Sequence, residues 1–287
     1  METLESLVTA ARECGFTNLQ WITQIARSAI SLYPQGRGPE LPFASRIGGM
    51  PGLPLSMRWP QYGGCSMEFI AQVDLESLPH SAIEDDMPRS GRLLFFYDQL
   101  ERSTGGCDGD FQGSWSVVLV PEPVAREAIV TEWPADLPAD SRFEACGLLA
   151  AVTLTLPHWD SVLIEDLELD QRQLTAYQDL LFRVTGDDPW VSRALLGGYP
   201  DQIQGDMTLD CAQAWLAVQN PEIDCAGSVY TAECRADSHE WRLLLQVPSI
   251  RAANMLWGDE TGCLYYWIRN EDLRALRFDR TQLILQF

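Results

Sequence analysis

The spacing of apolar residues predicts two helices at the start of the chain. One helical stripe covers residues 3–15, and a second covers residues 18–33 and stops before Pro34, which cannot continue a helix. We therefore expect an N-terminal helical segment over residues 1–43. The apolar positions of the two stripes are Leu4, Leu7, Val8 and Ala11, followed by Leu19, Ile22, Ala26 and Ile30.

After Arg46 the pattern changes to short apolar runs separated by Gly and Pro, which is typical of strands joined by irregular loops. Helical stripes interrupt these runs later in the chain, and Asp210 stands where it can cap one of those helices. The pattern predicts an α+β protein. The predicted strands are 67–73, 92–97, 115–120, 147–156, 242–247, 263–268 and 282–286, and the predicted helices are 169–184, 211–219 and 270–276.

One sequence pattern occurs twice. A Gly-Gly-x-Pro turn at 48–51 precedes an apolar strand that ends in Gln72-Val73, and a second such turn at 197–200 precedes a strand that ends in Gln246-Val247. In both halves Gly-x-Leu and an aromatic strand follow. A Gln buried in such a strand needs a hydrogen-bond partner, for which we expect the backbone of the neighbouring loop.

This repetition predicts the overall organisation of the fold. We expect two pseudo-repeated antiparallel sheet units, about 44–156 and 190–287, that pack their apolar faces together as one globule. The N-terminal helical pair and the other helices would then lie at the periphery. Residues 44–287 would form a single domain rather than two independent ones.

The repeated segments carry a family resemblance. The matching segments are 46–54 (RIGGMPGLP), 58–60 (RWP), 69–75 (FIAQVDL), 91–98 (GRLLFFYD), 196–204 (LGGYPDQIQ), 241–247 (WRLLLQV), 256–259 (LWGD), 266–268 (YWI) and 272–273 (DL). Together they resemble the YwqG-like family of bacterial proteins over roughly residues 44–287. The resemblance implies a mixed α/β structure with a duplicated antiparallel sheet unit. It implies no enzyme activity, because none is established for the family as a class.

Charge narrows the range of partners. The net charge is −21, all 20 basic residues are Arg, and residues 65–237 hold 31 acids against nine Arg. Direct binding to nucleic acid or to an anionic membrane requires positive charge at the contact, so we expect neither. The acidity serves either a solvated surface or the steering of a basic partner.

The sequence contains no pattern for a metal site, a cofactor or a catalytic centre. The eight Cys include no CxxC pair and only three His accompany them, so we expect reduced, mostly buried thiols and no metal. His158 and His239 lie beside Asp160 and Glu240, but no nucleophile is near them in the sequence, so we expect no catalytic residue. Cys65 is expected to be buried or incidental rather than a reactive thiol. Since we find neither a signal peptide nor a membrane-spanning stretch, we expect a cytoplasmic protein.

Aromatic residues and acids alternate over residues 159–210, which hold eleven acids and three Arg. Aromatic anchors surrounded by charge are typical of a tight, steered interface. The alternative is a helix with a solvated acidic face followed by a buried Trp. The partner-binding candidates are Asp166, Glu168, Asp187, Asp188, Trp190, Tyr199, Asp201 and Asp206.

Two functions remain open at this stage. Some YwqG-like relatives look like immunity proteins, which are encoded beside secreted toxins and protect the producing cell by binding the toxin. The resemblance and the charge together favour an immunity protein that neutralises a basic protein toxin, a nuclease (DNase) effector, by stoichiometric inhibition. It would be a monomer or a simple heterodimer with the toxin. The alternative is a small-ligand-binding protein or enzyme with a cleft between the repeats, lined by Arg46, Gln72, Gln246 and Asp259.

Overall fold

The computed structural model describes residues 3–37, 41–82, 86–99, 113–186, 192–220, 230–258 and 260–287. Its helices are α1 (Leu4–Glu13), α2 (Leu19–Ile25), α3 (Val162–Glu165), α4 (Gln171–Thr185), α5 (Met207–Gln219), α6 (Ala232–Ser238) and α7 (Asn270–Arg274). Its strands are β1 (Arg27–Arg37), β2 (Arg46–Ile47), β3 (Gln61–Tyr62), β4 (Cys65–Ser66), β5 (Glu68–Asp74), β6 (Arg92–Tyr97), β7 (Trp115–Val120), β8 (Cys146–Thr155), β9 (Ala194–Leu196), β10 (Trp241–Pro248), β11 (Cys263–Arg269) and β12 (Gln282–Gln286). The predicted mixture of helices and sheet is confirmed.

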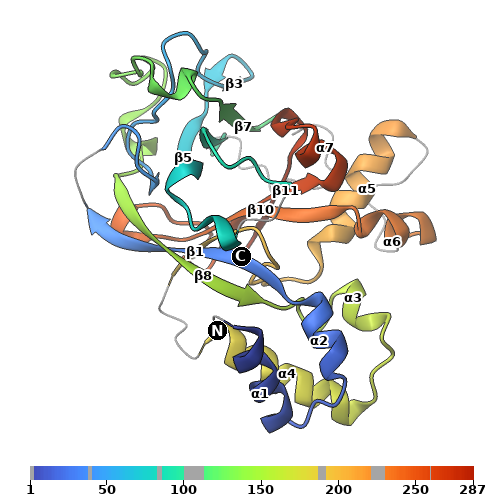
Figure 1. Ribbon diagram of the computed structural model, residues 1–287. Helices are drawn as coiled ribbons and strands as arrows, with labels where there is room; N and C mark the ends of the chain where they lie inside the picture. The colour runs from blue at the N-terminus through green and yellow to red at the C-terminus, as the bar shows by residue number, and fades with distance from the viewer. Residues whose placement is uncertain are drawn as a thin grey trace.

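One large antiparallel sheet dominates the molecule (Figure 1). Its ten strands follow the order β12-β11-β10-β9-β1-β8-β2-β5-β6-β7. The sheet curls so far that its two edge strands, β7 and β12, come together. A hydrogen bond shows this contact: the indole Nε1 of Trp115 on β7 donates to the backbone oxygen of Thr281 beside β12, at 2.9 Å. Inside the curl, the Tyr266 hydroxyl donates to the Phe96 backbone oxygen at 3.2 Å. The sheet is therefore nearly closed.

The predicted helix over 18–33 is wrong in its second half. Helix α2 ends at Ile25, and β1 runs from Arg27 through the centre of the sheet between β8 and β9. Along β1 the side chains alternate: Ile30 and Leu32 pack inside the curled sheet, whereas Ala29 packs on its outer face. The spacing of Ala26 and Ile30 fits a helix equally well, so pairing with distant strands decides the outcome.

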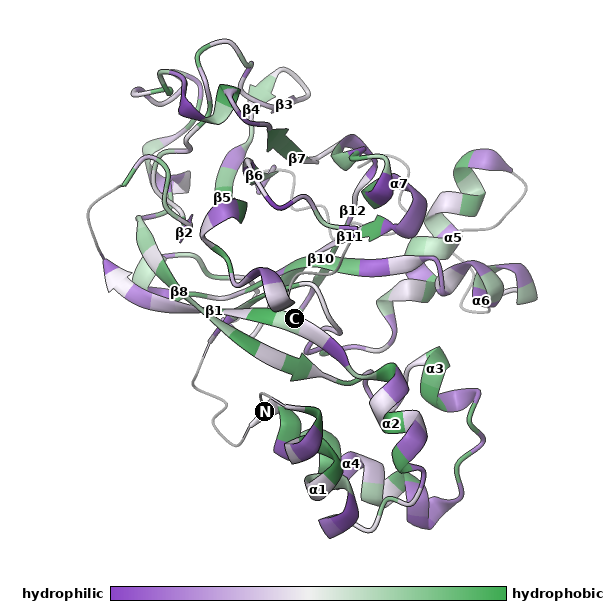
Figure 2. Ribbon diagram, in the orientation of Figure 1, coloured by the Kyte–Doolittle hydropathy of each residue, from purple (hydrophilic) through white to green (hydrophobic). Residues whose placement is uncertain are grey.

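Apolar clusters lie on both faces of the sheet. The interior cluster joins the two halves, and the rings of Phe95 and Tyr266 lie 5.1 Å apart within it. Outside, α5 and α6 cover β10 and β11, while the segments around Leu53 and Ala125 cover β5 and β6. A separate cluster packs α1, α2 and α4 against the end of β8, and Figure 2 shows green and purple residues alternating around these helices.

Side chains cap the starts of five helices, α1, α2, α4, α5 and α6. The Thr3 hydroxyl accepts from the backbone N–H of Ser6, and Asp170 caps α4 in the same way. The predicted cap of the 211–219 helix is wrong: α5 begins at Met207, and its cap is Asp206. Asp210 instead lies in the first turn and accepts a hydrogen bond from the Tyr230 hydroxyl at 2.5 Å.

The two Gly-Gly turns make matching contacts. Gly48 donates its N–H to the Ile70 oxygen on β5 at 2.8 Å, and Gly197 donates to the Leu244 oxygen on β10 at 3.2 Å. Gly198 has a φ of +70°, and a Cβ there would lie 2.5 Å from Thr155 Oγ1, so only glycine fits. Both partner strands also carry a register shift at the same place, between Phe69 and Ala71 on β5 and between Leu243 and Leu245 on β10.

The two strand glutamines bond to loop backbone, as expected from the sequence. The Oε1 of Gln72 accepts from the N–H of Gly52, and the Oε1 of Gln246 accepts from the N–H of Asp201, both at 2.8 Å. In each half the accepted N–H belongs to the fourth residue after the first glycine of the turn.

Candidate functional site

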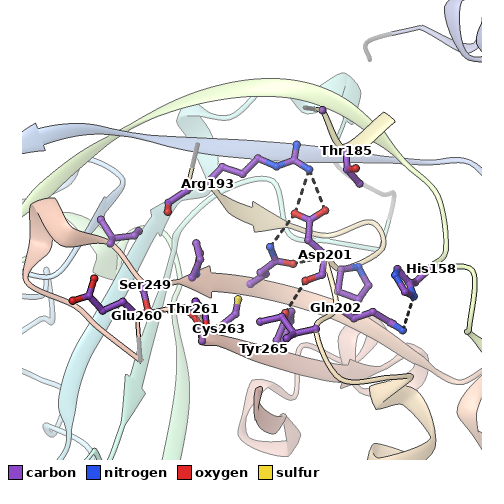
Figure 3. A pocket seen from close by; sticks show the side chains of 18 of the residues that line it. His158, Thr185, Arg193, Asp201, Gln202, Ser249, Glu260, Thr261, Cys263 and Tyr265 are labelled. Atoms are coloured by element: carbon purple, nitrogen blue, oxygen red, sulfur yellow. Dashed lines mark hydrogen bonds and ion pairs between the residues drawn. The ribbon is translucent and has the colours of Figure 1, made fainter. Parts of the chain in front are cut away.

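A broad pocket of about 1130 Å³ opens beside the C-terminal half of the sheet. Figure 3 shows its lining side chains converging from strands and loops that lie far apart in the sequence. The contributing segments are the end of β1, the loop after β8, the last turns of α4, both flanks of β9, β10, and the turn that leads into β11. The nearly closed sheet brings these segments together, so no single motif encodes the pocket.

A hydrogen-bonded polar network forms the floor of the pocket (Figure 3). The Asp201 carboxylate lies 3.3 Å from the Arg193 guanidinium and accepts from Gln246 Nε2 at 3.0 Å. The Asp201 backbone oxygen accepts from the Tyr265 hydroxyl at 2.7 Å, and Arg193 also donates to Ser31 Oγ at 2.8 Å. The floor is thereby rigid, and its charges are matched.

Two potential nucleophiles on this floor stay protonated. Burial raises the pKa of the Cys263 thiol well above its ordinary value, and burial likewise raises the pKa of the Tyr265 phenol. A buried neutral thiol is inert, since the thiolate is the reactive form. These two side chains therefore contribute packing and hydrogen bonds rather than nucleophilic chemistry.

A His–Asp pair stands at one side of the pocket. His158 Nδ1 lies 2.5 Å from Asp160 Oδ1, and Gln202 Nε2 lies 3.2 Å from the same ring nitrogen and also bonds to Asp160. The second His noted in the sequence behaves differently. His239 faces Asp166, at 3.8 Å, rather than its neighbour Glu240.

Three exposed apolar side chains line the pocket, and we call them the apolar rim: Trp159, Phe182 and Ile203. Their exposed fractions are 40%, 62% and 46%. Exposed large apolar side chains gathered around one depression are a feature of binding surfaces. All three side chains lie in the segment 159–210 that was expected to form an interface, but neither they nor Arg193 were among the predicted partner-binding residues.

Local structure explains why the rim is exposed and fixed. Phe182 lies on α4 opposite the face that buries Tyr177 and Leu181. The loop that carries Trp159 is anchored by the Tyr177 hydroxyl, which donates to the Pro157 oxygen at 2.7 Å. The backbone N–H of Ile203 donates to Gln286 Oε1 at 2.8 Å. The rim side chains are thus presented on anchored backbone, which lowers the entropy cost of binding.

The predicted partner-binding acids fall into separate places. Asp201 lies in the pocket floor. The carboxylate of Asp206 instead accepts hydrogen bonds from the N–H of Thr208, at the start of α5, and from the N–H of Val162. Asp166 pairs with Arg235 at 3.3 Å on the surface, and Glu168 is exposed. Tyr199 lies beneath the Arg27 guanidinium, 4.6 Å from ring to Cζ. The candidates Asp187, Asp188 and Trp190 lie outside the described residues.

The predicted ligand-cleft residues do not meet in one cleft. Gln246 lines the pocket, but Arg46 and Gln72 are cross-strand partners on β2 and β5, on the other side of β1 and β8. Arg46 is 3% exposed and donates to the Leu41 oxygen at 2.7 Å and to the Met50 oxygen. Its role is therefore to hold the 41–50 loop on the sheet. Asp259 lies outside the described residues.

The described residues form neither a metal-binding cluster nor a membrane-spanning helix. Within the part of the chain that the structure describes, no group of three or more His, Cys, Asp or Glu side chains is placed to hold a metal ion. Among the described helices, none combines the length and the apolar character needed to cross a membrane. Cys65, expected to be buried or incidental, is exposed on the surface.

The fold and the pocket define a mixed α/β protein whose nearly closed antiparallel sheet carries a surface pocket with an apolar rim. A family model described as a Domain of unknown function (DUF1963) matches residues 45–286. The chain therefore belongs to this family of uncharacterised domains. Among the curated proteins, none matches the chain.

Proposed function

We propose that this chain is an immunity protein that binds a basic protein toxin through the apolar rim and neutralises it by stoichiometric inhibition. The observation that carries the proposal is the exposed rim of Trp159, Phe182 and Ile203 around a rigid, charge-matched floor. Aromatic side chains that are fixed before binding act as interface anchors. The proposed toxin is a nuclease effector, and the proposed complex is a heterodimer in the cytoplasm of the producing cell.

Charge next to the rim supports a basic partner. The segment 157–186, which carries two of the three rim residues, holds six acids and two Arg. A nuclease binds phosphate through Arg and Lys, so an acidic surface complements it and raises the association rate. The resemblance to the YwqG-like family also supports the proposal, because some members of that family look like immunity proteins.

The test uses the toxin encoded beside the gene. The two purified proteins should form a one-to-one complex, and cells that express the toxin should survive when this chain is co-expressed. Trp159→Ala and Phe182→Ala should each weaken affinity at least about 30-fold, the size of an interface hot spot. Leu55→Ala, which removes a side chain that is 68% exposed outside the pocket, is the matched control.

Three outcomes would sink the proposal. They are the absence of a complex at micromolar concentration, the absence of protection, or rim variants that bind as tightly as Leu55→Ala. Thermal melts of the variants distinguish lost binding from lost folding. The association rate should also fall as salt rises, because screening weakens the attraction between the exposed charges.

A small ligand in the same pocket is the second candidate function. The pocket volume of about 1130 Å³ and the convergence of Arg193, Asp201 and Gln246 favour it. A thermal-shift screen against metabolites, nucleotides and divalent metals tests this candidate. Specific stabilisation together with no toxin gene nearby would favour a ligand over a toxin.

We infer further that the sheet arose from two copies of one unit. The support is the matched geometry of the two Gly-Gly turns and of the two strand glutamines. Gln72 and Gln246 each accept a hydrogen bond from the fourth residue after the first glycine of the turn. If the two glutamines are equivalent, replacing each one should accelerate amide exchange in its own loop and leave the other loop unchanged. The equivalence would be contradicted if either replacement changed amide exchange equally in both loops, or changed it in neither loop.

A further inference from the structure

A second, smaller cavity lies next to the pocket. Its volume is about 60 Å³, and His158, Pro200 and Gln202 line both spaces. Figure 3 shows His158 and Gln202 side by side at the edge of the pocket. Its lining also includes four side chains from β1, the starts of α3 and α5, and the strand β11: Arg27, Ser161, Asp206 and Trp267.

Two buried polar groups in this cavity are unsatisfied. Trp267 is 3% exposed and Ser161 is 6% exposed, and both line the cavity. The indole Nε1 of Trp267 and the hydroxyl of Ser161 have no hydrogen-bond partner among the described residues. Ser161 is also the residue before α3, yet its side chain makes no capping bond. Buried polar groups in folded proteins are almost always paired, so these two indicate a guest that the chain alone does not supply.

The unsatisfied indole and a nearby guanidinium call for hydrogen-bond acceptors in this cavity. Trp267 can only donate, and the Arg27 guanidinium, held over the Tyr199 ring, adds further donors and a positive charge. Among the described residues of the lining, Asp206 is the one that carries a carboxylate, and its oxygens already accept from the Thr208 N–H and hydroxyl and from the Val162 N–H, at 2.7–2.9 Å. A guest must therefore bring its own acceptors.

We propose that this cavity binds a small oxyanion, a phosphate or a carboxylate group. Such a group supplies acceptors for Trp267 and Ser161 and a negative charge for Arg27. The volume of about 60 Å³ holds about four water molecules or one oxyanion of similar size. Since the whole chain carries a net charge of −21, the long-range field opposes anions, and binding depends on this local cluster of donors. The inference is independent of toxin binding.

Indole signals in a ¹H–¹⁵N NMR spectrum provide the test. The chain has ten Trp, and Trp267→Phe, which keeps the ring packing but removes the donor, identifies the Trp267 signal. The protein is titrated separately with inorganic phosphate and with acetate, against sodium chloride at equal ionic strength. The Trp267 indole signal should move saturably with one or both oxyanions and not with chloride. A response to phosphate alone assigns the site to a phosphate group, and a response to acetate alone assigns it to a carboxylate.

Two substitutions make the test specific. Arg27→Gln should weaken oxyanion affinity at least ten-fold, whereas Arg172→Gln, the same charge change on the exposed face of α4, should leave it unchanged. Ser161→Ala should weaken it by a smaller factor, and it identifies the site if Trp267→Phe does not fold. The proposal is overturned if neither oxyanion moves the Trp267 signal, if chloride moves it equally, or if Arg27→Gln binds like Arg172→Gln. In those cases the cavity holds water only.

Discussion

Replacing Gln72 with Leu tests how strongly one buried side chain holds the first Gly-Gly loop on the sheet. Gln72 is fully buried, and its Oε1 accepts from the Gly52 N–H at 2.8 Å. Its Nε2 donates to the backbone oxygens of Pro42 and Ala44, at 3.1 and 2.8 Å. Gln72→Leu nearly preserves the volume but removes all three bonds, so it isolates their contribution to the free energy of unfolding.

The size of the loss in unfolding free energy depends on which of the three groups bonded to Gln72 water can reach in the variant. Gly52 is buried, so its N–H remains unsatisfied in the variant and costs about 1–3 kcal/mol. Pro42 and Ala44 are at least partly exposed, and water can replace most of what their oxygens lose. We expect Gln72→Leu to lower the free energy of unfolding by about 2–4 kcal/mol in total. Gln246→Leu should cost only about 1 kcal/mol, because both of its hydrogen bonds to Asp201 are only partly buried, so water can replace part of what is lost.

Urea unfolding followed by tryptophan fluorescence measures both changes. Gln219→Leu, at the exposed end of α5, is the control and should stay within about 0.5 kcal/mol of the parent protein. Amide exchange measured by NMR should show faster exchange at Gly52 in Gln72→Leu and at Asp201 in Gln246→Leu. A Gln72→Leu protein as stable as the control, or less affected than Gln246→Leu, would show that the three bonds of Gln72 do not hold the loop on the sheet.

Two further predictions concern side chains outside the pocket floor. Asp206→Ala removes the α5 cap and the bond to the Val162 N–H, and should cost about 1–2 kcal/mol in urea unfolding, whereas Asp206→Asn should retain most of the stability; equal losses in both variants would contradict the capping role. Burial raises the pKa of Glu68 above its ordinary 4.5. Just above pH 4.5 the folded state therefore retains a proton that the unfolded state has lost. The stability contributed by this group falls as pH rises above 4.5. Glu68→Gln should therefore stabilise the protein at pH 8 and have much less effect near pH 4; a variant that is no more stable than the parent at pH 8 would show that Glu68 has an ordinary pKa.

The sequence predicts most strands and helices because their apolar patterns are local. Strands β5 to β8 and β10 to β12 lie within one or two residues of their predicted bounds. The error in residues 27–33 has a different cause. A short apolar run fits the helical period of 3.6 residues as well as the strand period of 2. Residues 27–33 form a strand only because β1 pairs with strands more than 100 residues away.

The pocket is harder to predict, because its residues come from separate parts of the chain. Gln246 was identified from the repeat, and Asp201 from the acidic segment, but nothing in the sequence joins them. Their contact depends on the turn after β9 folding back over β10. Phe182 has no sequence signal beyond an apolar residue on the polar face of α4, which is a pattern that many surface helices contain.

The central position of β1 has a consequence for how the domain is delimited. The family match begins at residue 45, after β1 has ended, yet β1 separates β8 from β9 in the middle of the sheet. A fragment cut to the match would expose the backbone donors and acceptors of β8 and β9 as two new strand edges, which are templates for self-association. During synthesis, the same strand has to wait for β8, since Arg27 pairs with Thr155, and then for β9. Strand β1 is thus synthesised before both of its neighbours but is fully paired only after them, and the two halves of the sheet join only when it is in place.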